Sequence, residues 1–189
     1  MIIKRILNNN AVMSLDKHGE EIIVKGKGIA FHKKTGDVID EKVIDKIFVM
    51  NNQETKRRYQ EILISIPSDC MSACEDMIGV IKQNIEKELS DKIYVTLTDH
   101  IYNLIERVKM GIVFDNALLW DVKRLYAKEY QVGLIVVDMI RQQFDIKIED
   151  DEASFIALHI VNAEMDTEFR DVIEITGMID DIYDIEIGR

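Results

Sequence analysis

Residues 71–89 read MSACEDMIGVIKQNIEKEL, and their spacing decides the fold of the larger part of the chain. Apolar side chains recur here every three or four positions, which is the period of an amphipathic helix. Residues 67–69, Pro-Ser-Asp, stand just before this stretch and are typical of a helix start. Similar stripes recur as far as Ala163, with Gly111 and Gly133 expected as breaks between helices. The sequence therefore predicts an all-helical part beyond residue 66.

The first fifty residues follow a different pattern. Short apolar and β-branched runs alternate with turn residues, as in Asn8-Asn9-Asn10, and residues 16–21 are expected to close a hairpin. The pattern predicts a sheet of about four short strands. So small a sheet has little core of its own, so we expect it to dimerise through one face. The runs lie at residues 2–3, 6–7, 11–13, 22–24 and 46–50.

The composition is that of a soluble globular protein, with 47% hydrophobic and 31% charged residues among 189. Apolar runs fall short of the roughly 20 residues that cross a bilayer, and the N-terminus lacks a signal-peptide pattern, which predicts a cytoplasmic chain without membrane insertion. Cys70 and Cys74 have helical spacing and are predicted to be buried hydrophobic residues. The four histidines lack zinc-ligand spacing, so we expect no metal and no other cofactor.

Charge is distributed unevenly along the chain. Residues 1–50 contain nine Lys or Arg and seven Asp or Glu, a net charge of +2. Because the whole chain carries −11, the remaining residues carry −13. A nucleic acid is attracted to the first fifty residues and repelled by the rest.

Residues 25–37, KGKGIAFHKKTGD, form a basic, glycine-rich segment around one aromatic ring, Phe31. Single-stranded or loop RNA is bound by this combination, because unstacked bases lie on aromatic rings while Lys and Arg contact phosphates. Asn8 and Asn10 could supply amides that read base edges, and Arg5 a further cation. An ordinary hairpin loop, with Phe31 in the core, remains open as the alternative.

Two histidines occupy similar helical settings, His100 in LTDHIYNLI and His159 in FIALHIVNAE. The ordinary interpretation is a hydrogen-bonded core histidine. Alternatively, a ring nitrogen accepts a phosphoryl group, which adds about −1.5 to −2 charges. General acid–base catalysis is a third possibility, but the sequence offers no nucleophile motif and no third partner. We therefore expect no catalytic residues and no enzyme.

Several segments resemble the BglG/SacY/LicT family of transcriptional antiterminators. Residues 3–12, IKRILNNNAV, and 26–37, GKGIAFHKKTGD, are similar to the family's RNA-binding co-antiterminator domain. Three further segments resemble the family's first regulation domain, which the sugar phosphotransferase system (PTS) controls. They are IYVTLTDHI, NALLWDVKRLY and DEASFIALHIVNAE, which begin at residues 93, 116 and 151. The resemblance covers nearly the whole chain, in the expected order.

The resemblance implies a multidomain α and β protein, with a small antiparallel β-sheet RNA-binding domain followed by an all-helical regulation domain. The implied boundaries are residues 1–55 for the RNA-binding domain, 56–66 for a linker helix and 67–170 for the first PTS regulation domain. Residues 171–189 are expected to open a second regulation domain. We expect that the chain was cut short there, rather than being a naturally short regulator.

The family's function is to bind, as a homodimer, a hairpin in nascent leader mRNA and so prevent a terminator from forming. Its histidines are phosphorylated by the phosphotransferase system. Phosphorylation of the first regulation domain by the sugar-specific transporter is linked to inactivation, whereas HPr acts through the second regulation domain. The alternative is a helical dimer that senses phosphorylation without binding RNA. Neither the sugar nor the operon is indicated.

Carried over by position, the resemblance assigns the site residues. Lys27 stands where relatives often have arginine, so the planar fork of a guanidinium is missing at that position. The implied phosphoacceptors are His100 and His159. The implied RNA contacts are Arg5, Asn8, Asn10, Gly26, Lys27, Gly28, Phe31 and Lys33.

Overall fold

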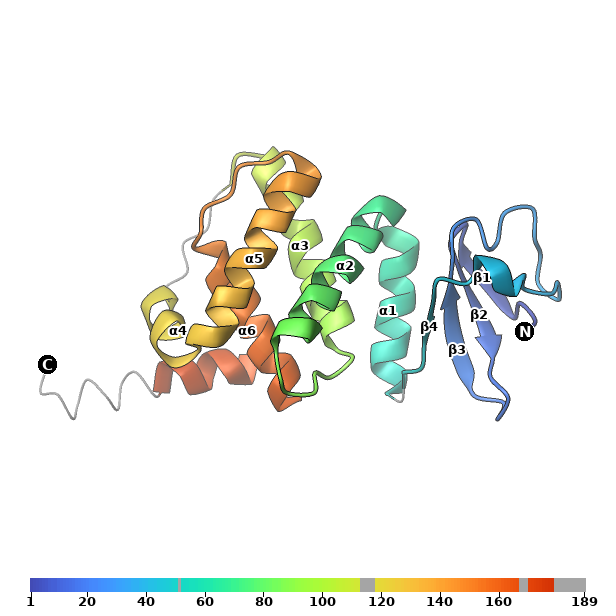
Figure 1. Ribbon diagram of the computed structural model, residues 1–189, viewed down its shortest axis with the longest axis horizontal. Coiled ribbons are helices and arrows are strands. Elements are labelled where there is room, and N and C mark those ends of the chain that lie inside the picture. Colours follow the sequence, from blue (N-terminus) through green and yellow to red (C-terminus); the bar gives the residue numbers. More distant parts are fainter. Residues whose placement is uncertain (51, 113–117, 167–169, 179–189) are drawn as a thin grey trace, which may run out of the picture. The chain divides into compact units, whose positions relative to one another are not determined.

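The computed structural model describes residues 1–50, 52–112, 118–166 and 170–178. The chain divides after Met71 into two compact units, which are described separately. Figure 1 colours them along the sequence, from the sheet to the helices. The predicted fold class is confirmed, since a four-stranded antiparallel sheet is followed by an all-helical part.

The sheet of the first unit has the strand order β1-β2-β3-β4, with every neighbouring pair antiparallel. The predicted hairpin at residues 16–21 is confirmed, because Leu15 pairs with Glu21. Its turn is held by Asp16, whose Oδ1 accepts the backbone N–H groups of His18 at 2.8 Å and Glu20 at 2.9 Å. The strands are β1 Arg5–Asn8, β2 Ala11–Leu15, β3 Glu21–Lys25 and β4 Lys46–Phe48.

One face of the sheet packs on the segment that connects β3 to β4. This segment contains a short 3₁₀ helix, Glu41–Val43. Alternation along a strand sends successive side chains to opposite faces. The apolar side chains on this face and in the connecting segment form a hydrophobic core cluster. Its buried members are Ile3, Val12, Ile22, Val24, Ile29, Ala30 and Ile39.

Helix α1, Gln53–Ser65, covers the other face of the sheet, as Figure 1 shows. The helix begins at Asn52, whose side chain accepts the N–H of Thr55 at 2.9 Å and satisfies one of the open donors of the first turn. Tyr59 and Leu63 are buried, with exposed fractions of 0% and 1%. The ring of Tyr59 lies 5.1 Å from that of Phe48 in β4.

The predicted amphipathic helix is confirmed as far as Asn84, whereas residues 85–89 lie beyond its end. Helix α2 begins at Ser68, as the Pro-Ser-Asp triplet predicts, and both Cys70 and Cys74 are buried on it. Within the described residues, none of the helices is long and apolar enough to span a membrane. The helices are α2 Ser68–Asn84, α3 Ile93–Lys109, α4 Leu119–Leu125, α5 Ala127–Phe144 and α6 Glu152–Met165.

The stretch expected to open a second regulation domain, residues 171–189, is only partly described. Residues 170–178 are helical, and residues 179–189 lie outside the described residues. Val172 is fully buried, and the Thr176 hydroxyl lies 3.3 Å from that of Tyr126. The described part of this stretch therefore packs on the helical unit.

The predicted break at Gly133 is wrong, whereas the one at Gly111 is confirmed. Gly111 follows α3 with a φ of +71°, a left-handed conformation that favours glycine. Gly133 lies inside α5, where a Cβ atom would stand 2.5 Å from the carbonyl oxygen of Ala153 in α6. The glycine therefore serves the close approach of two helices, which its helix-breaking tendency alone does not reveal.

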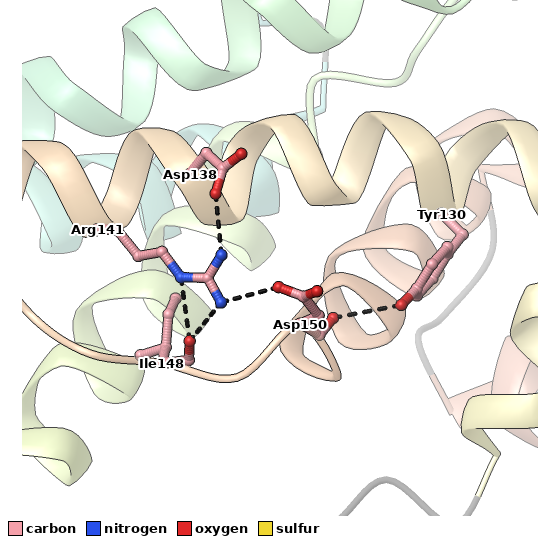
Figure 2. Close-up of polar contacts among 5 residues, drawn as sticks. All are labelled: Tyr130, Asp138, Arg141, Ile148 and Asp150. Carbon is pink, nitrogen blue, oxygen red and sulfur yellow. Dashed lines mark hydrogen bonds and ion pairs between the residues drawn. The ribbon is translucent and has the colours of Figure 1, made fainter.

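The connection from α5 to α6 is held by Arg141, as Figure 2 shows. Its Nε and Nη2 both donate to the carbonyl of Ile148, at 3.0 and 2.5 Å. Nη2 also donates to Asp150 at 2.8 Å, and Nη1 to Asp138 at 2.9 Å. A planar guanidinium suits several acceptors at once. The chain is therefore fixed just before the first residue of α6, Glu152.

Candidate RNA-binding surface and histidine site

The segment after β3 forms a tight loop that is tied to the β1–β2 turn. The N–H of Gly26 donates to the carbonyl of Asn10 at 3.0 Å, and the N–H of Ala30 to that of Asn9 at 3.1 Å. Phe31 donates its N–H to the Gly28 carbonyl at 2.9 Å. These bonds fix the loop beside the asparagine turn.

The ring of Phe31 lies outside the core, with 61% of the residue exposed. It contacts the ring of His32, whose centroid is 4.0 Å away. His32 has a φ of +57°, which is uncommon for a residue other than glycine. Burial therefore does not explain why an aromatic residue stands at position 31, whereas a stacking contact would.

Glycine is required at two positions of this loop, for a different structural reason at each. A Cβ atom on Gly26 would lie 1.7 Å from the carbonyl oxygen of Val43, so only glycine fits there. Gly28 has a φ of +68°, which glycine adopts at little cost. The N–H of Gly28 donates to Oδ1 of Asn10 at 2.8 Å. Both residues shape the loop that carries Phe31.

The predicted cationic contacts are exposed, and two of them lie in this loop. Lys27 lies next to Gly28, and its backbone N–H donates to Asp45 at 3.2 Å. Lys33 is exposed, and its Nζ donates to the carbonyl of Val38 at 3.3 Å. Arg5 stands at the start of β1, where its guanidinium donates to Oε1 of Gln60 in α1.

Asn8 uses both ends of its side-chain amide within the protein. Nδ2 donates to the carbonyl of Leu63 at 2.6 Å, and Oδ1 accepts the N–H of Asn10 at 2.8 Å. The structure thus joins Asn8, Asn10, Gly28 and Phe31 in one hydrogen-bonded arrangement, with Lys27 in the same loop.

The helical unit brings the two candidate histidines together. His100 lies in α3 and His159 in α6, and their ring centroids are 4.9 Å apart. The His100 side chain is 14% exposed, whereas His159 is buried. Phe155, one turn before His159, lies 5.8 Å from the His100 ring.

A carboxylate and a guanidinium complete this histidine site. Oε2 of Glu152 lies 3.5 Å from Nε2 of His100, and Oε1 of Glu152 lies 3.6 Å from Nη2 of Arg107. The side chains of Glu152 and Arg107 are mostly buried, at 10% and 18% exposed. Glu152 thus links the His100 ring to the Arg107 guanidinium, a cation that favours added negative charge nearby.

Burial lowers the pKa of His159 well below its ordinary value, and the neighbouring His100 lowers this pKa further. A buried imidazole loses the solvation that stabilises its charged form. His159 is therefore neutral at pH 7 and keeps a nucleophilic ring nitrogen.

Sequence reasoning did not find Glu152 and Arg107. The acidic residues nearest the histidines in sequence lie elsewhere, since Asp99 is exposed and Glu164 forms an ion pair with Lys87 at 2.7 Å. The spacing of Arg107 and Glu152 from the histidines could have indicated them. Arg107 follows His100 by seven residues, and Glu152 precedes His159 by seven, so each shares a helix face with its histidine.

Comparison with known proteins assigns both units. The family model described as CAT RNA binding domain matches residues 1–57. The model described as PRD domain matches residues 75–163. A CAT RNA-binding domain followed by a PRD domain defines the class of regulator to which the chain belongs.

Individual relatives identify the family within this class. The transcription antiterminator LicT of Bacillus subtilis (strain 168) is 40% identical over 98% of this chain and 67% of its own length. The beta-glucoside operon antiterminator of Dickeya chrysanthemi is 37% identical, over 98% and 65% respectively. The crystal structure of GlcT CAT-PRDI is similar with a TM-score of 0.75 at 32% identity, over 86% of this chain and 97% of that one.

The chain belongs to the BglG/LicT family of transcription antiterminators. It spans about two thirds of the length of these two curated relatives, 67% of one and 65% of the other.

Proposed function

We propose that this chain is a transcriptional antiterminator that binds a hairpin in nascent leader mRNA and prevents a terminator from forming. The exposed ring of Phe31 carries the proposal, because it stands outside the core on a loop that also presents Lys27 and Lys33. Arg5, Asn10 and the backbone of Gly26 and Gly28 complete the proposed contact surface. RNA loops are bound by such a set of ring, cations and amides.

The proposed domains follow the boundaries expected from the sequence. Residues 1–55 bind RNA, residues 56–66 are the linker helix and residues 67–170 are the first PTS regulation domain. Residues 171–189 begin a second regulation domain, through which HPr acts. The active form is a homodimer in the cytoplasm.

His100 and His159 are the proposed phosphoacceptors, and the sugar-specific transporter of the phosphotransferase system is the donor. The two adjacent rings, with Arg107 linked to His100 through Glu152, support this role, since a guanidinium stabilises an added phosphoryl group. His100 is the more exposed of the two, which favours it as the first acceptor. The chain is thus a substrate of phosphoryl transfer and not an enzyme.

The test is a salt titration of the whole chain with a leader-type RNA stem-loop that has unpaired bases. We expect log affinity to fall linearly as log salt rises, because Lys and Arg displace counterions from phosphates. A fully paired stem of the same length should bind more weakly, since its bases cannot stack on Phe31.

Two substitutions separate stacking from general charge attraction. Phe31→Ala should weaken binding by about 1–3 kcal/mol with an unchanged melting temperature. Trp120→Ala is the matched control, because Trp120 is 76% exposed in the helical unit and should leave RNA affinity unchanged. Absence of RNA binding by a folded dimer would leave the alternative, a helical module that senses phosphorylation.

A further inference from the structure

We propose that Asn8 is a positioning residue that couples helix α1 to the RNA-binding loop, rather than a residue that contacts RNA. Its side chain joins the C-terminal part of α1 to the asparagine turn, because it donates to Leu63 and accepts from Asn10. The effect of this coupling on RNA affinity rests on the proposed function. The coupling itself is measurable without RNA.

A short series of hydrogen bonds runs from α1 to the loop. The Leu63 carbonyl in α1 accepts from Nδ2 of Asn8 at 2.6 Å. Oδ1 of Asn8 accepts from the N–H of Asn10 at 2.8 Å, and Oδ1 of Asn10 accepts from the N–H of Gly28 at 2.8 Å. Gly28 then accepts the N–H of Phe31 through its carbonyl at 2.9 Å.

The orientation of the Asn8 amide is fixed by the protein. An asparagine side chain has one carbonyl oxygen and one NH₂ group. Each end makes one hydrogen bond inside the protein, so the amide cannot turn toward a base without breaking a bond that shapes the loop. Asn10 differs, because only its Oδ1 is used by Gly28, so its NH₂ group can face the RNA.

Helix α1 holds both ends of strand β1. At the first residue, Arg5 donates to Oε1 of Gln60. At the last residue, Asn8 donates to the carbonyl of Leu63. A guanidinium has five N–H donors, so Arg5 can be held by Gln60 and still contact a phosphate. A shift of α1 would therefore act on Arg5 and on the loop at the same time.

Burial makes the docked position of α1 specific. Tyr59 and Leu63 are almost fully buried against the sheet, and Tyr59 contacts Phe48. Packed interfaces of this kind move as units instead of deforming gradually. Undocking of α1 would break the bond from Asn8 to Leu63 and release the Asn8 amide, which also holds Asn10.

The test is a double-mutant cycle in the whole chain, read by amide hydrogen exchange at Asn10 and Gly28. Tyr59→Ala undocks α1, and Ile64→Ala is its control because Ile64 is 62% exposed on the same helix. Asn8→Ser keeps an acceptor for the N–H of Asn10, as in a serine turn, but is too short to reach Leu63. A pairwise coupling appears as non-additivity of the two changes.

We expect Tyr59→Ala to accelerate exchange at Gly28 by about tenfold in the wild-type background, as loss of one hydrogen bond would. In the Asn8→Ser background, the same change should have little further effect. Equal acceleration in both backgrounds, or no acceleration at all, would overturn the proposal. Should Tyr59→Ala fail to fold, Gln60→Ala loosens α1 at its other tie and completes the cycle.

RNA affinity supplies the second readout. Asn8→Ala should lower affinity for the stem-loop about tenfold and accelerate exchange at Asn10, whereas Asn9→Ala, an exposed neighbour, should change neither. Lost affinity with unchanged exchange would make Asn8 a direct RNA contact and refute the positioning role. If the wild-type chain binds no RNA, the proposed function fails, and the exchange cycle still decides whether α1 and the loop are coupled.

Discussion

At the scale of single residues, the histidine site combines burial with one nearby cation. His159 is buried beside His100, and the Glu152 carboxylate lies between His100 and Arg107. A phosphoryl group on His100 would compete with Glu152 for Arg107, because both are anions and the guanidinium is the cation common to them. Negative charge added to the His100 ring would therefore repel the carboxylate of Glu152, the first residue of α6.

The depressed pKa of His159 predicts a pH-dependent stability. In the unfolded chain the pKa of a histidine is about 6.5, and burial lowers the pKa of His159 in the folded protein. From about pH 6.5 down to the folded pKa the unfolded chain binds more protons than the folded one, so the free energy of unfolding falls as pH decreases. One such site contributes a slope that rises toward a limit of about 1.4 kcal/mol per pH unit as the unfolded imidazole becomes fully protonated. Urea unfolding at pH 7.5, 6.5 and 5.5, followed by helical circular dichroism, measures it.

His159→Gln should remove this slope between pH 6.5 and 5.5, whereas His18→Gln, in an exposed turn of the sheet, should leave it intact. Measurements stop at pH 5.5 because ordinary carboxylates begin to titrate below it. If the wild type and His159→Gln show the same slope, His159 is not held neutral by burial.

Residue types in sequence were enough to nominate Phe31, His100 and His159, because an aromatic ring among lysines and a histidine in an apolar stripe are local patterns. Local patterns do not say what a side chain will contact. The neighbours of His100 come from α6, 52 or more positions away, and the binding partner of Asn8 comes from α1. Such contacts arise from tertiary packing, which composition and period do not encode.

At the scale of elements, α5 and α6 meet at Gly133. A Cβ atom there would stand 2.5 Å from the Ala153 carbonyl, at the start of the helix that carries His159. Gly133→Ala should destabilise the helical unit by about 1–3 kcal/mol, because the two helices must separate to admit a methyl group. Thermal unfolding followed by circular dichroism measures this change.

Gly79→Ala is the matched control for that prediction. Gly79 also lies inside a helix, α2, but a Cβ atom there would meet nothing within 4 Å. This substitution should stabilise the chain by about 0.5–1 kcal/mol, since alanine is the better helix former. Two changes of opposite sign at chemically identical substitutions would show that helix contact, and not propensity, selects Gly133. Two changes of the same sign would contradict this.

Elements were more predictable than their partners. Period and turn residues located the hairpin at Asp16 and the start of α2 at Ser68, because both depend on neighbours within a few positions. The role of Gly133 depends instead on Ala153, twenty residues away, so helix propensity alone suggested a break. The docking of α1 on the sheet likewise joins Tyr59 to Phe48 across two separate elements.

At the scale of the whole molecule, the two parts of the sequence carry net charges of opposite sign. The first fifty residues carry +2 and the remainder −13, so RNA is attracted to the sheet and repelled by the helices. The proposed phosphorylation would add about −1.5 to −2 charges per histidine to the part of the chain that is already negative. In the proposed two-fold symmetric dimer each modified site would occur twice, which would double the added charge.

This arrangement predicts that charge at the histidine site, and not loss of the rings, weakens RNA binding. The variant with His100→Asp and His159→Asp should form fewer dimers and bind the RNA stem-loop about tenfold more weakly, a change of about 1.4 kcal/mol. The variant with asparagine at both positions has the same shape without the charge, and should stay close to the wild type in both properties. Sedimentation equilibrium and RNA titration measure dimerisation and affinity, with a thermal melt to verify folding. Equal losses in the two variants would trace the effect to the missing imidazoles, and unchanged affinity in both would exclude an electrostatic switch at this site.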